Sequence, residues 1–386
     1  MKIFLVSRGW PTPNDSQWGS FECDQAHSLK ERGHEIIVAN IDGRFRFKNR
    51  KYGLSYKNYD GIKVYTLGIF PALLIYKISN SLWLYIYQKI MVYLIEIIIK
   101  KEGKPDLFYA HYFTNITSII PLKNVYNVPL VGMEHWSVMA YKTLPNYVKK
   151  WANKVYPQLD LLISVSPSLR DNLKYHFNVN SIVIGNTINK IFFNEALIEK
   201  KSLNKKQFDF ISIGNLLPIK GFDLLLKAFY RSTLYKENVH LTIIGEGVER
   251  NKLEAMIKQL GLSNSVYLPG RKNREQILEY LQNSDAFISS SLSETFGVVY
   301  IEAMSQGLPV VGTKCGGPES FISEEEGILV STNDVNALSQ AMCEMYSNIN
   351  KYNREIIRNK IINNFSLESV GLKLETEFKK LLISKK

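Results

Sequence analysis

The stretch from Asp285 to Gly312 constrains the fold of this chain most strongly. Its sequence, DAFISSSLSETFGVVYIEAMSQGLPVVG, predicts a strand, a polar loop, a helix, a turn and a second strand. Apolar residues recur at helical spacing after Gly297, and Gly307 has the residue type that ends helices in a left-handed conformation. Such a unit belongs to an open α/β sheet. Ligands of these sheets bind at the carboxyl ends of strands, where helix N-termini favour phosphate groups.

Two carboxylates, Glu294 and Glu302, stand on either side of the predicted helix start. Two charges on a solvated helix face are the common explanation for such a pair. Glu302, however, falls within the apolar run VVYIEAM, where an unpaired charge is costly. Carboxylate oxygens accept hydrogen bonds from hydroxyl groups, so the pair favours a hydroxyl-rich ligand such as a sugar or a ribose.

The longer segment SLSETFGVVYIEAMSQGLPVVGTKCGGPES resembles the signature of the retaining, nucleotide-sugar-dependent glycosyltransferases of family four, the Glu-x7-Glu group with the GT-B fold. The resemblance covers nearly the whole chain and is weaker before residue 190. It implies an α/β protein of two Rossmann-like domains that face each other across a cleft. Residues 1–190 would bind the acceptor and residues 191–365 the nucleotide-sugar donor, and residues 366–386 would form a helix that crosses back to the first domain.

The resemblance also implies roles for residues of the second half. Glu302 would bind the ribose hydroxyls, Lys220 and the helix start would bind the diphosphate, and Glu294 would contact the transferred sugar. Further donor-binding residues are implied at the helix start, namely Thr295, Phe296, Gly297 and Val298. Gly245, in the glycine turn, and Arg271, beside the base, are implied as well. Such enzymes work without a metal, and the nucleotide sugar is a substrate, so neither a metal site nor a cofactor is expected.

One position of the second half departs from the family's pattern. Relatives carry an arginine and a lysine that grip the diphosphate. Lys220-Gly221 matches the lysine, but Asn215 stands where the arginine is usual. A lysine at the amino end of a helix is unusual unless an anion is bound there. The missing arginine predicts weaker donor binding, compensation by another cation, or reduced activity.

In the first half, the candidate binding residues follow predicted strands. Gly19 and Ser20 open the helix after the first strand and offer an approach point for a phosphate or a sugar, where relatives commonly carry two glycines. His111 and His135 each end a strand. One such histidine is more often a packing residue, whereas two that face one cleft favour a site. The resemblance places His135 at the donor sugar, with Glu294 and Lys220 as the other catalytic residues, and His111 on the acceptor side.

The net charge of +12 is concentrated in residues 1–190, which hold 24 Lys and Arg against 13 Asp and Glu. Such a field suits nucleic acid or an anionic membrane leaflet. The sequence contains no nucleic-acid-binding module, so nucleic acid is not an expected partner. An anionic membrane surface is expected, and a merely solvated basic face is the alternative. Residues 42–60 interleave basic and aromatic side chains, which fits either a contact surface for phospholipid headgroups or a solvated loop.

The sequence shows no secretion signal. The amino terminus, MKIFLVSRGWP, has only four consecutive apolar residues, and the three cysteines are far apart. The apolar segment of residues 69–100 is interrupted by Lys77, Lys89 and Glu96, so we expect a core helix with an interfacial face rather than a membrane span. The expected location is the cytoplasm, peripheral on the inner face of the plasma membrane.

These observations predict a retaining transferase that moves a hexosyl residue from a nucleotide sugar to a saccharide or a lipid-linked saccharide in cell-surface polysaccharide assembly. Two alternatives stay open. Asn215 motivates a donor-binding or scaffolding subunit with impaired catalysis. A nucleotide-sugar epimerase of the same architecture is the other, although epimerases lack the ordered Glu-x7-Glu.

Overall fold

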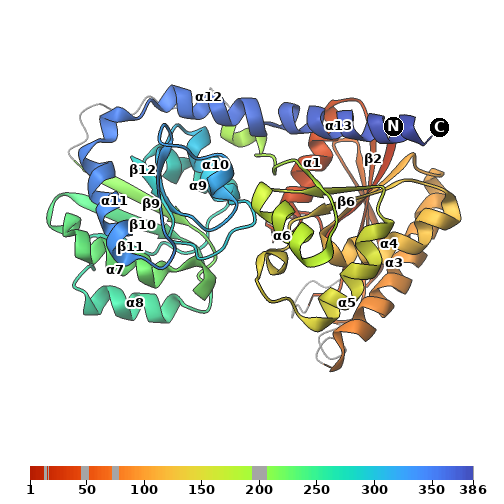
Figure 1. Cartoon of the computed structure of the whole chain (residues 1–386), viewed down its shortest axis with the longest axis horizontal. Coiled ribbons are helices and arrows are strands. Elements are labelled where there is room, and N and C mark those ends of the chain that lie inside the picture. The colour runs from red at the N-terminus through yellow and green to blue at the C-terminus, as the bar shows by residue number, and fades with distance from the viewer. Residues whose placement is uncertain (13–14, 16, 45–51, 72–77, 194–206, 386) are drawn as a thin grey trace. The chain divides into compact units, whose positions relative to one another are not determined.

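The computed structural model describes residues 1–12, 15, 17–44, 52–71, 78–193 and 207–385. The chain divides into two compact units. Unit 1 comprises Met1–Thr187 and Leu367–Lys386, and unit 2 comprises Ile188–Ser366. Each unit is an α/β fold built on a mostly parallel sheet with helices on its faces (Figure 1). The predicted pair of Rossmann-like domains is therefore confirmed.

Unit 1 contains an eight-stranded sheet in the order β3-β4-β2-β1-β5-β6-β7-β8. Its strands are β1 (Lys2–Val6), β2 (Glu35–Asp42), β3 (Gly53–Tyr59), β4 (Ile62–Gly68), β5 (Leu107–His111), β6 (Leu130–Glu134), β7 (Leu161–Ser164) and β8 (Ile182–Val183). Its helices are α1 (Ser20–Glu31), α3 (Asn80–Glu102), α4 (Tyr112–Tyr126), α5 (Asn146–Val155), α6 (Pro167–Phe177) and α13 (Leu367–Ser384). Only the edge strand β3 runs antiparallel to its neighbour, β4. In Figure 1, α1 and α13 pack together on one side of the sheet, and α3 and α4 on the other.

The order of the unit 1 strands reverses between β1 and β5. From β1 the chain passes through α1 to β2 on one side, and from β5 it passes through α4 to β6 on the other. The loops at the carboxyl ends of β1 and β5 therefore lead in opposite directions, and such a point is where open α/β sheets bind ligands. Both β5 and β6 are buried at every position, as helices on both faces of a parallel sheet require.

Unit 2 contains a six-stranded parallel sheet in the order β11-β10-β9-β12-β13-β14. Its strands are β9 (Phe208–Ile213), β10 (Val239–Ile244), β11 (Val266–Tyr267), β12 (Ala286–Ile288), β13 (Val310–Thr313) and β14 (Gly327–Val330). Its helices are α7 (Phe222–Ser232), α8 (Arg250–Gln259), α9 (Arg274–Gln282), α10 (Val298–Ser305), α11 (Val335–Ser347) and α12 (Arg354–Phe365). The strand order reverses between β9 and β12, so the carboxyl ends of these two strands form the candidate ligand-binding edge of unit 2.

The segment that most constrained the prediction folds as β12, α10 and β13. Gly297 precedes α10 at a φ of 93°, and Gly307 follows it at 73°, both in the left-handed region that favours glycine. A Cβ at Gly307 would also lie 2.6 Å from the carbonyl oxygen of Arg354. Glycine is therefore required at this turn both by backbone conformation and by the close approach of α12.

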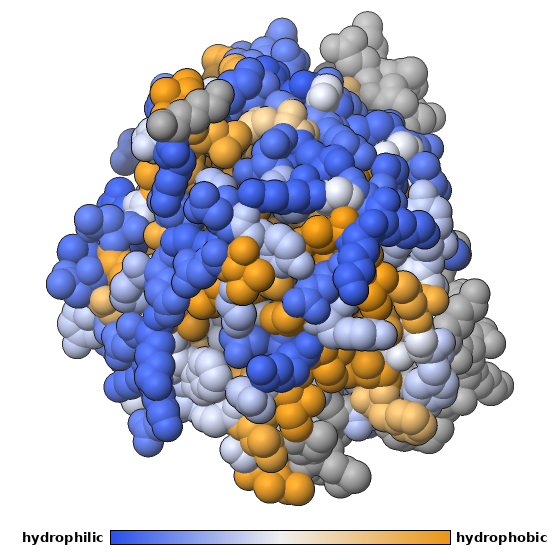
Figure 2. Space-filling view, turned by 90° about the vertical axis from the view of Figure 1, so that its right-hand side faces the viewer, coloured by the Kyte–Doolittle hydropathy of each residue, from blue (hydrophilic) through white to orange (hydrophobic). Residues whose placement is uncertain are grey.

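Helix α3 accounts for the apolar segment before β5. It is long and apolar enough to cross a membrane by length and composition, with a mean hydropathy of 1.6 over a window of which 33% is buried. Leu84, Met91 and Ile98 are buried on its inner face, whereas Tyr93 is 59% exposed. Figure 2, which faces the side of the molecule where α3 lies in Figure 1, shows hydrophobic side chains gathered in its lower half. A core role therefore describes only one face of this helix.

Helix α13 belongs to unit 1, where it packs against α1. Its buried carboxylate, Glu375, lies 2.7 Å from Lys379, pairs with Arg32 just after α1 and lies 3.4 Å from His34. The hydrogen bonds from Lys379 and Arg32 lower the pKa of Glu375 to about 2, although burial opposes this shift. A charged cluster therefore fastens the C-terminal helix to the first Rossmann-like fold.

Candidate functional site

The side chains of Lys220 and Glu294 are in contact at the candidate ligand-binding edge of unit 2. The Nζ atom of Lys220 lies 2.5 Å from Oε1 of Glu294, and the hydroxyl of Ser291 donates to the same oxygen at 2.8 Å. Lys220 ends a short 3-10 turn before α7, and Glu294 lies in the loop between β12 and α10. Two residues that sequence reasoning proposed from separate motifs thus meet at the point where the strand order reverses.

The backbone of the Glu294 loop is pinned to the loop that follows β13. The N–H of Glu294 donates to the carbonyl of Cys315, and the N–H of Gly317 donates to the carbonyl of Glu294, both at 2.9 Å. A Cβ at Gly317 would lie 2.3 Å from the backbone of Phe296. The two loops therefore touch backbone to backbone, and this contact fixes the position of the Glu294 carboxylate.

The predicted residues at the start of α10 differ in what they offer a ligand. The ring of Phe296 is buried against Phe321 and Phe365, so only its backbone could contact a ligand. Thr295 and Val298 are half-buried, and Gly297 is buried. The first N–H groups of a helix have no intrahelical acceptor, so this helix start offers donors to an anion.

Glu302 lies on α10 and is half-buried between the fully buried Ile301 and Ala303. Burying a carboxylate completely within an apolar run is costly. Part of the Glu302 side chain reaches solvent, so the structure avoids this cost.

Asn215 and Gly245 lie in neighbouring loops, after β9 and β10. Asn215 is exposed, and the loops are joined by a hydrogen bond from the N–H of Leu216 to the carbonyl of Glu246 at 2.9 Å. A Cβ at Gly245 would lie 1.9 Å from the carbonyl oxygen of Gly214. The close contact between the two loops is therefore enough to explain why position 245 is a glycine, without reference to a ligand.

The two arginines near these loops have different surroundings. Arg250 lies 2.6 Å from Glu246 and 2.8 Å from Glu254, and it donates to the carbonyl of Leu268. Arg271 is exposed and forms no ion pair with any residue in the described ranges. Arg271 is therefore the cation of this region that a ligand could engage without first breaking an ion pair.

In unit 1, His111 and His135 are in direct contact at the ends of β5 and β6. Nδ1 of His111 lies 3.0 Å from Nε2 of His135, and the rings are nearly parallel with centroids 5.2 Å apart. Both side chains are buried. Burial, and then the positive charge of Arg8, lowers the pKa of His111 to about 3. Burial, the neighbouring His111 and Arg8 also lower the pKa of His135. The pair is therefore neutral at physiological pH, and one ring donates to the other.

Glu134 is the fully buried carboxylate beside this pair. Its Oε1 accepts the backbone N–H of His135 at 3.1 Å and that of Trp136 at 2.9 Å, and its Oε2 accepts the hydroxyl of Tyr156 at 2.8 Å. Burial raises the pKa of Glu134 to about 7, against the opposing effect of these hydrogen bonds. Glu134 therefore holds the backbone at His135 in place and titrates near neutral pH.

Replacing Glu134 with glutamine should change how stability depends on pH. A carboxyl whose pKa rises from 4.5 to about 7 on folding binds more protons when folded, so it lowers stability as the pH rises between these values. The amide of Glu134→Gln would lack this effect, which amounts to at most about 1.4 kcal/mol per pH unit. The variant should therefore gain stability relative to the original protein as the pH rises from about 4.5 to 7.

Urea unfolding at several pH values across this window measures that difference. The control is Glu31→Gln, which changes an exposed glutamate on α1. His111, whose pKa is lowered, contributes stability that rises with pH up to about 6.5 in both proteins and cancels in the comparison. Parallel stability curves for Glu134→Gln and the original protein would mean that Glu134 is ionised across the whole range.

Gly19 and Ser20 lie where α1 begins. Gly19 has a φ of 78°, and a Cβ there would lie 2.2 Å from the carbonyl oxygen of Gly9. Ser20 is buried. The close contact between the Gly19 and Gly9 backbones therefore requires a glycine at this position whatever the ligand.

Two charged residues of unit 1, the half-buried Arg8 and the fully buried Glu22, were not predicted from the sequence. Arg8 follows β1, and its Nε lies 3.1 Å from Oε1 of Glu22 on α1. Arg8 lies at the reversal point between β1 and β5, close enough to His111 and His135 to lower the pKa of both. The position of Arg8 shortly after the first strand was the sequence signal that could have indicated it.

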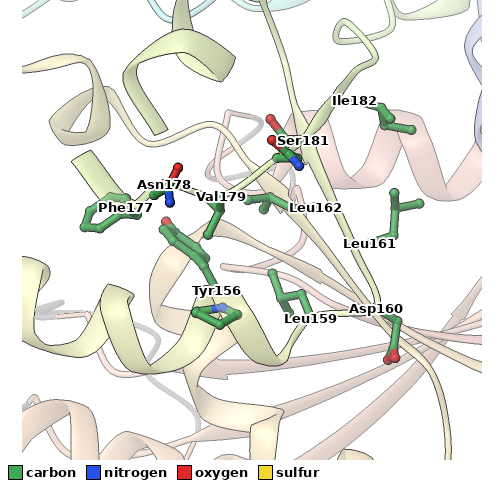
Figure 3. Close-up of a pocket in the computed structure, with 12 residues that line it drawn as sticks. Tyr156, Leu159, Asp160, Leu161, Leu162, Phe177, Asn178, Val179, Ser181 and Ile182 are labelled. Atoms are coloured by element: carbon green, nitrogen blue, oxygen red, sulfur yellow. The ribbon is translucent and has the colours of Figure 1, made fainter. Parts of the chain in front are cut away.

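A cavity of about 630 Å³ opens elsewhere in unit 1, where β7 and β8 begin (Figure 3). Tyr156, Phe177 and Leu162 line it together with Asp160. The carboxylate of Asp160 is already paired with Lys123 at 3.1 Å and with Lys385 at 2.5 Å. The cavity lies at the amino ends of the strands, whereas the histidines lie at the carboxyl ends, so it is not part of the candidate site.

Among the residues that the structure describes, no group of three or more His, Cys, Asp or Glu side chains is placed to hold a metal ion.

Two families match the chain, one over each half. Residues 23–190 match Glycosyltransferase Family 4, and residues 193–361 match Glycosyl transferases group 1.

Curated relatives align over part of their length. An uncharacterized glycosyltransferase of Methanocaldococcus jannaschii is 31% identical over 247 residues, which are 59% of this chain and 60% of that protein. The N-acetylgalactosamine-N,N'-diacetylbacillosaminyl-diphospho-undecaprenol 4-alpha-N-acetylgalactosaminyltransferase of Campylobacter jejuni is 30% identical over 196 residues, which are 50% of this chain and 52% of the enzyme. The alignments thus span little more than half the length of these relatives.

Solved structures match over the full length of the chain. Sucrose-phosphate synthase from Thermosynechococcus elongatus superimposes with a TM-score of 0.82 at 17% identity and covers 100% of both chains. HepE of Anabaena, solved in complex with UDP and glucose, has a TM-score of 0.73 at 17% identity and covers 98% of this chain and 100% of its own. At these identities the likeness shows the fold alone.

Proposed function

Because this chain belongs to the glycosyltransferases of the GT-B fold, we propose that it moves a hexosyl residue from a nucleotide sugar to a saccharide or a lipid-linked saccharide, with retention of configuration. The contact between Lys220 and Glu294 carries this proposal. A cation and a carboxylate that lie side by side near the start of α10 support the binding of a diphosphate next to sugar hydroxyls.

In this proposal unit 2 binds the donor. The ammonium of Lys220 and the first N–H groups of α10 bind the diphosphate, Glu294 accepts hydrogen bonds from hydroxyls of the transferred sugar, and Glu302 accepts those of the ribose. A diphosphate beside Lys220 would share its ammonium with Glu294, which lies 2.5 Å away. Arg271, which has no ion pair among the described residues, supplies the second cation that Asn215 does not.

The chemistry then consists of stabilising a leaving group. The bond between the sugar's anomeric carbon and the diphosphate oxygen breaks, the acceptor hydroxyl attacks the same face, and the departing diphosphate takes the acceptor proton. No metal is required, because Lys220 and the helix start offset the charge that develops on the diphosphate. Holding donor and acceptor in place supplies the rest of the catalysis.

Unit 1 binds the acceptor in this proposal, at the edge that carries His111 and His135. The Campylobacter relative, by its name, acts on a saccharide joined to diphospho-undecaprenol, and the solved HepE complex contains UDP and glucose. Both support a nucleotide-sugar donor and a lipid-linked saccharide acceptor in polysaccharide assembly for this chain. In this proposal the chain works in the cytoplasm, at the inner face of the plasma membrane.

Calorimetry with a panel of nucleotide sugars tests the proposal, followed by an assay of nucleoside diphosphate release in the presence of membrane-extracted acceptors. Binding of one donor together with release supports transfer. Binding without release in any acceptor extract would favour the scaffolding alternative. The absence of binding to every nucleotide sugar would contradict the proposal.

We further propose that unit 1 contacts an anionic membrane through the outer face of α3. Exposed apolar and aromatic side chains recur there at helical spacing: Ile78, just before the helix, and Leu82, Tyr85 and Tyr93 within it. Lys89 lies on the same face and approaches the ring of Tyr85 to 5.5 Å. An apolar face with tyrosines and a lysine is typical of helices that lie in the membrane interface.

The basic stretch of residues 42–60 contributes less directly. Arg44 is bonded to Asp15 and Asp42, and it lies 4.2 Å from the ring centroid of Trp18, so its charge is used within unit 1. Residues 45–51, which include Arg46, Lys48 and Arg50, lie outside the described residues.

Changing Leu82, Tyr85 and Tyr93 together to serine should weaken co-sedimentation with vesicles that contain anionic lipid. Each side chain is about half exposed, so inserting it is worth about 1 kcal/mol, and losing all three should reduce binding by about a hundredfold. The matched control changes three exposed apolar residues of unit 2, Tyr230, Val248 and Tyr267, to serine. Equal vesicle binding by the two triple variants would exclude α3 as the contact.

A further inference from the structure

A buried polar cluster surrounds the histidine pair at the carboxyl ends of β1 and β5. The carboxylate of Glu22 is fully buried, and its Oε1 accepts both the backbone N–H and the Nε–H of Arg8, each at 3.1 Å. The side chain of Arg8 is 33% exposed. Arg8 is therefore fixed at one end by a buried anion while part of its guanidinium reaches the surface of unit 1.

This cluster contains hydrogen-bonding atoms that the chain itself does not satisfy. Within the described part of the chain, Oε2 of Glu22, Nε2 of Gln25 and Nε2 of His111 are buried and have no hydrogen-bond partner. The terminal nitrogens of Arg8 form no hydrogen bond with a described residue either. A buried polar atom without a partner costs about 1–3 kcal/mol, and native proteins seldom gather several in one place unless a ligand or ordered water completes them.

Backbone strain marks the same place. Tyr112, the residue after β5, has a φ of 67°, which is a rare conformation for a bulky side chain. Its ring centroid lies 3.8 Å from the guanidinium carbon of Arg8 and 4.8 Å from the ring of His135. Strain of this kind costs about 1–3 kcal/mol and is concentrated at functional sites. Tyr112 thus links Arg8 to the histidine pair.

The charges of the cluster favour a neutral ligand. Glu22 offsets the charge of Arg8, and burial keeps both histidines neutral. Glu134, with a pKa of about 7, adds partial negative charge. An anion would therefore enter a buried site without net positive charge, which is unfavourable. Hydroxyl groups both donate and accept hydrogen bonds, so they suit a site that offers guanidinium donors together with imidazole and carboxylate groups.

We propose that Arg8 binds hydroxyls of a neutral sugar ring of the acceptor, and that Glu22 and Tyr112 position its guanidinium for this contact. The proposal deepens the proposed function, on which it rests, by naming a binding residue and the chemical class of its ligand. The planar guanidinium can reach two neighbouring oxygens at once, which a lysine ammonium cannot do in the same way. The buried unsatisfied atoms behind it are then completed by sugar hydroxyls or by water that bridges to them.

Saturation-transfer NMR of the full-length protein with methyl glycosides of glucose, galactose, mannose and N-acetylglucosamine tests the proposal. We expect at least one glycoside to bind the original protein and the matched control Arg170→Gln, which changes an exposed arginine of α6. Arg8→Gln should weaken that binding at least tenfold, because hydrogen bonds to a charged group are stronger than those between neutral groups. Arg8→Lys should recover only part of the affinity, and Glu22→Gln should weaken binding with Arg8 still present.

Three outcomes would overturn the proposal. They are unchanged glycoside binding in Arg8→Gln, no glycoside binding by the original protein, and displacement of the glycoside by inorganic phosphate in the original protein, which would indicate an anion site. Nucleotide-sugar binding by Arg8→Gln is measured in parallel and should be unchanged, which also shows that the variant is folded. If the original protein binds a nucleotide sugar while Arg8→Gln keeps its glycoside affinity, the proposed role of Arg8 is contradicted and the proposed function still stands. If no nucleotide sugar binds, the proposed function fails.

Discussion

Replacing Lys220 with alanine is expected to lower kcat/KM for the nucleotide sugar by about 10²–10³, because the variant loses a fixed cation where negative charge develops on the leaving diphosphate. Both kcat and the donor KM should worsen, since the ammonium would bind the diphosphate before and during bond breaking. The loss also leaves the Glu294 carboxylate without the partner that lies 2.5 Å away. That carboxylate would then repel the donor phosphates.

A double-mutant cycle with Glu294→Gln separates these two effects. If the unpaired carboxylate contributes to the defect, the double variant should lose less than the sum of the two single losses. Lys227→Ala is the matched control, since Lys227 is an exposed lysine of α7 that lies 3.8 Å from Asp223. Steady-state kinetics of Lys220→Ala that match those of Lys227→Ala would remove Lys220 from the site.

Replacing Glu302 with alanine is expected to abolish measurable transfer by weakening donor binding. Two hydrogen bonds from ribose hydroxyls to a carboxylate contribute about 1.5–3 kcal/mol each, so their loss should reduce donor affinity at least a hundredfold. Glu302 is half-buried on α10, between fully buried residues, so the helix itself fixes the position of the carboxylate.

A comparison of ligands identifies the role of Glu302 more sharply than activity does. The original protein should bind a 2',3'-dideoxynucleoside diphosphate much more weakly than the parent nucleoside diphosphate, whereas Glu302→Ala should bind both with similar low affinity. The control is Glu344→Ala, which changes an exposed glutamate of α11. A Glu302→Ala protein that still discriminates between the two ligands would show that the ribose is bound elsewhere.

The sequence was most informative where local pattern and tertiary environment agree. The segment from Asp285 to Gly312 alternates apolar strands, a polar loop and a glycine-bounded helix, and it folds as β12, α10 and β13. A binding role for the loop of this segment could also be predicted, because the carboxyl end of a buried parallel strand is a ligand-binding position in open α/β sheets. The roles of Glu294 and Lys220 followed from the resemblance to the glycosyltransferase family, although the contact between the two side chains could not be predicted.

Other parts of the site depend on contacts between distant segments. Gly245 looks like a ligand-binding glycine in sequence, but its missing side chain is required by the carbonyl of Gly214. The ring of Phe296 packs into the core of unit 2, although its position in the motif suggested a ligand contact. Sequence pattern cannot separate a glycine or an aromatic residue needed for packing from one needed for binding.

Charged residues buried against distant partners were the least predictable. Arg8 and Glu22 lie fourteen positions apart in sequence and meet where the loop after β1 contacts the first turn of α1. Helix α3 presents a related difficulty, since its apolar residues cover its whole circumference and only the fold decides which face is buried. The sequence therefore indicated a helix with an interfacial face but not which residues form that face.

The central claim is that this chain breaks the bond between a sugar and a nucleoside diphosphate with retention of configuration. Proton NMR of donor hydrolysis, without any acceptor, tests it most directly, because water then takes the acceptor's place and the anomer released first can be observed before it equilibrates. With an α-linked nucleotide sugar, we expect the α-anomer of the free sugar to accumulate first, and Lys220→Ala to slow its release by about 10²–10³. Initial release of the β-anomer, or no release from any nucleotide sugar that the protein binds, would contradict this account.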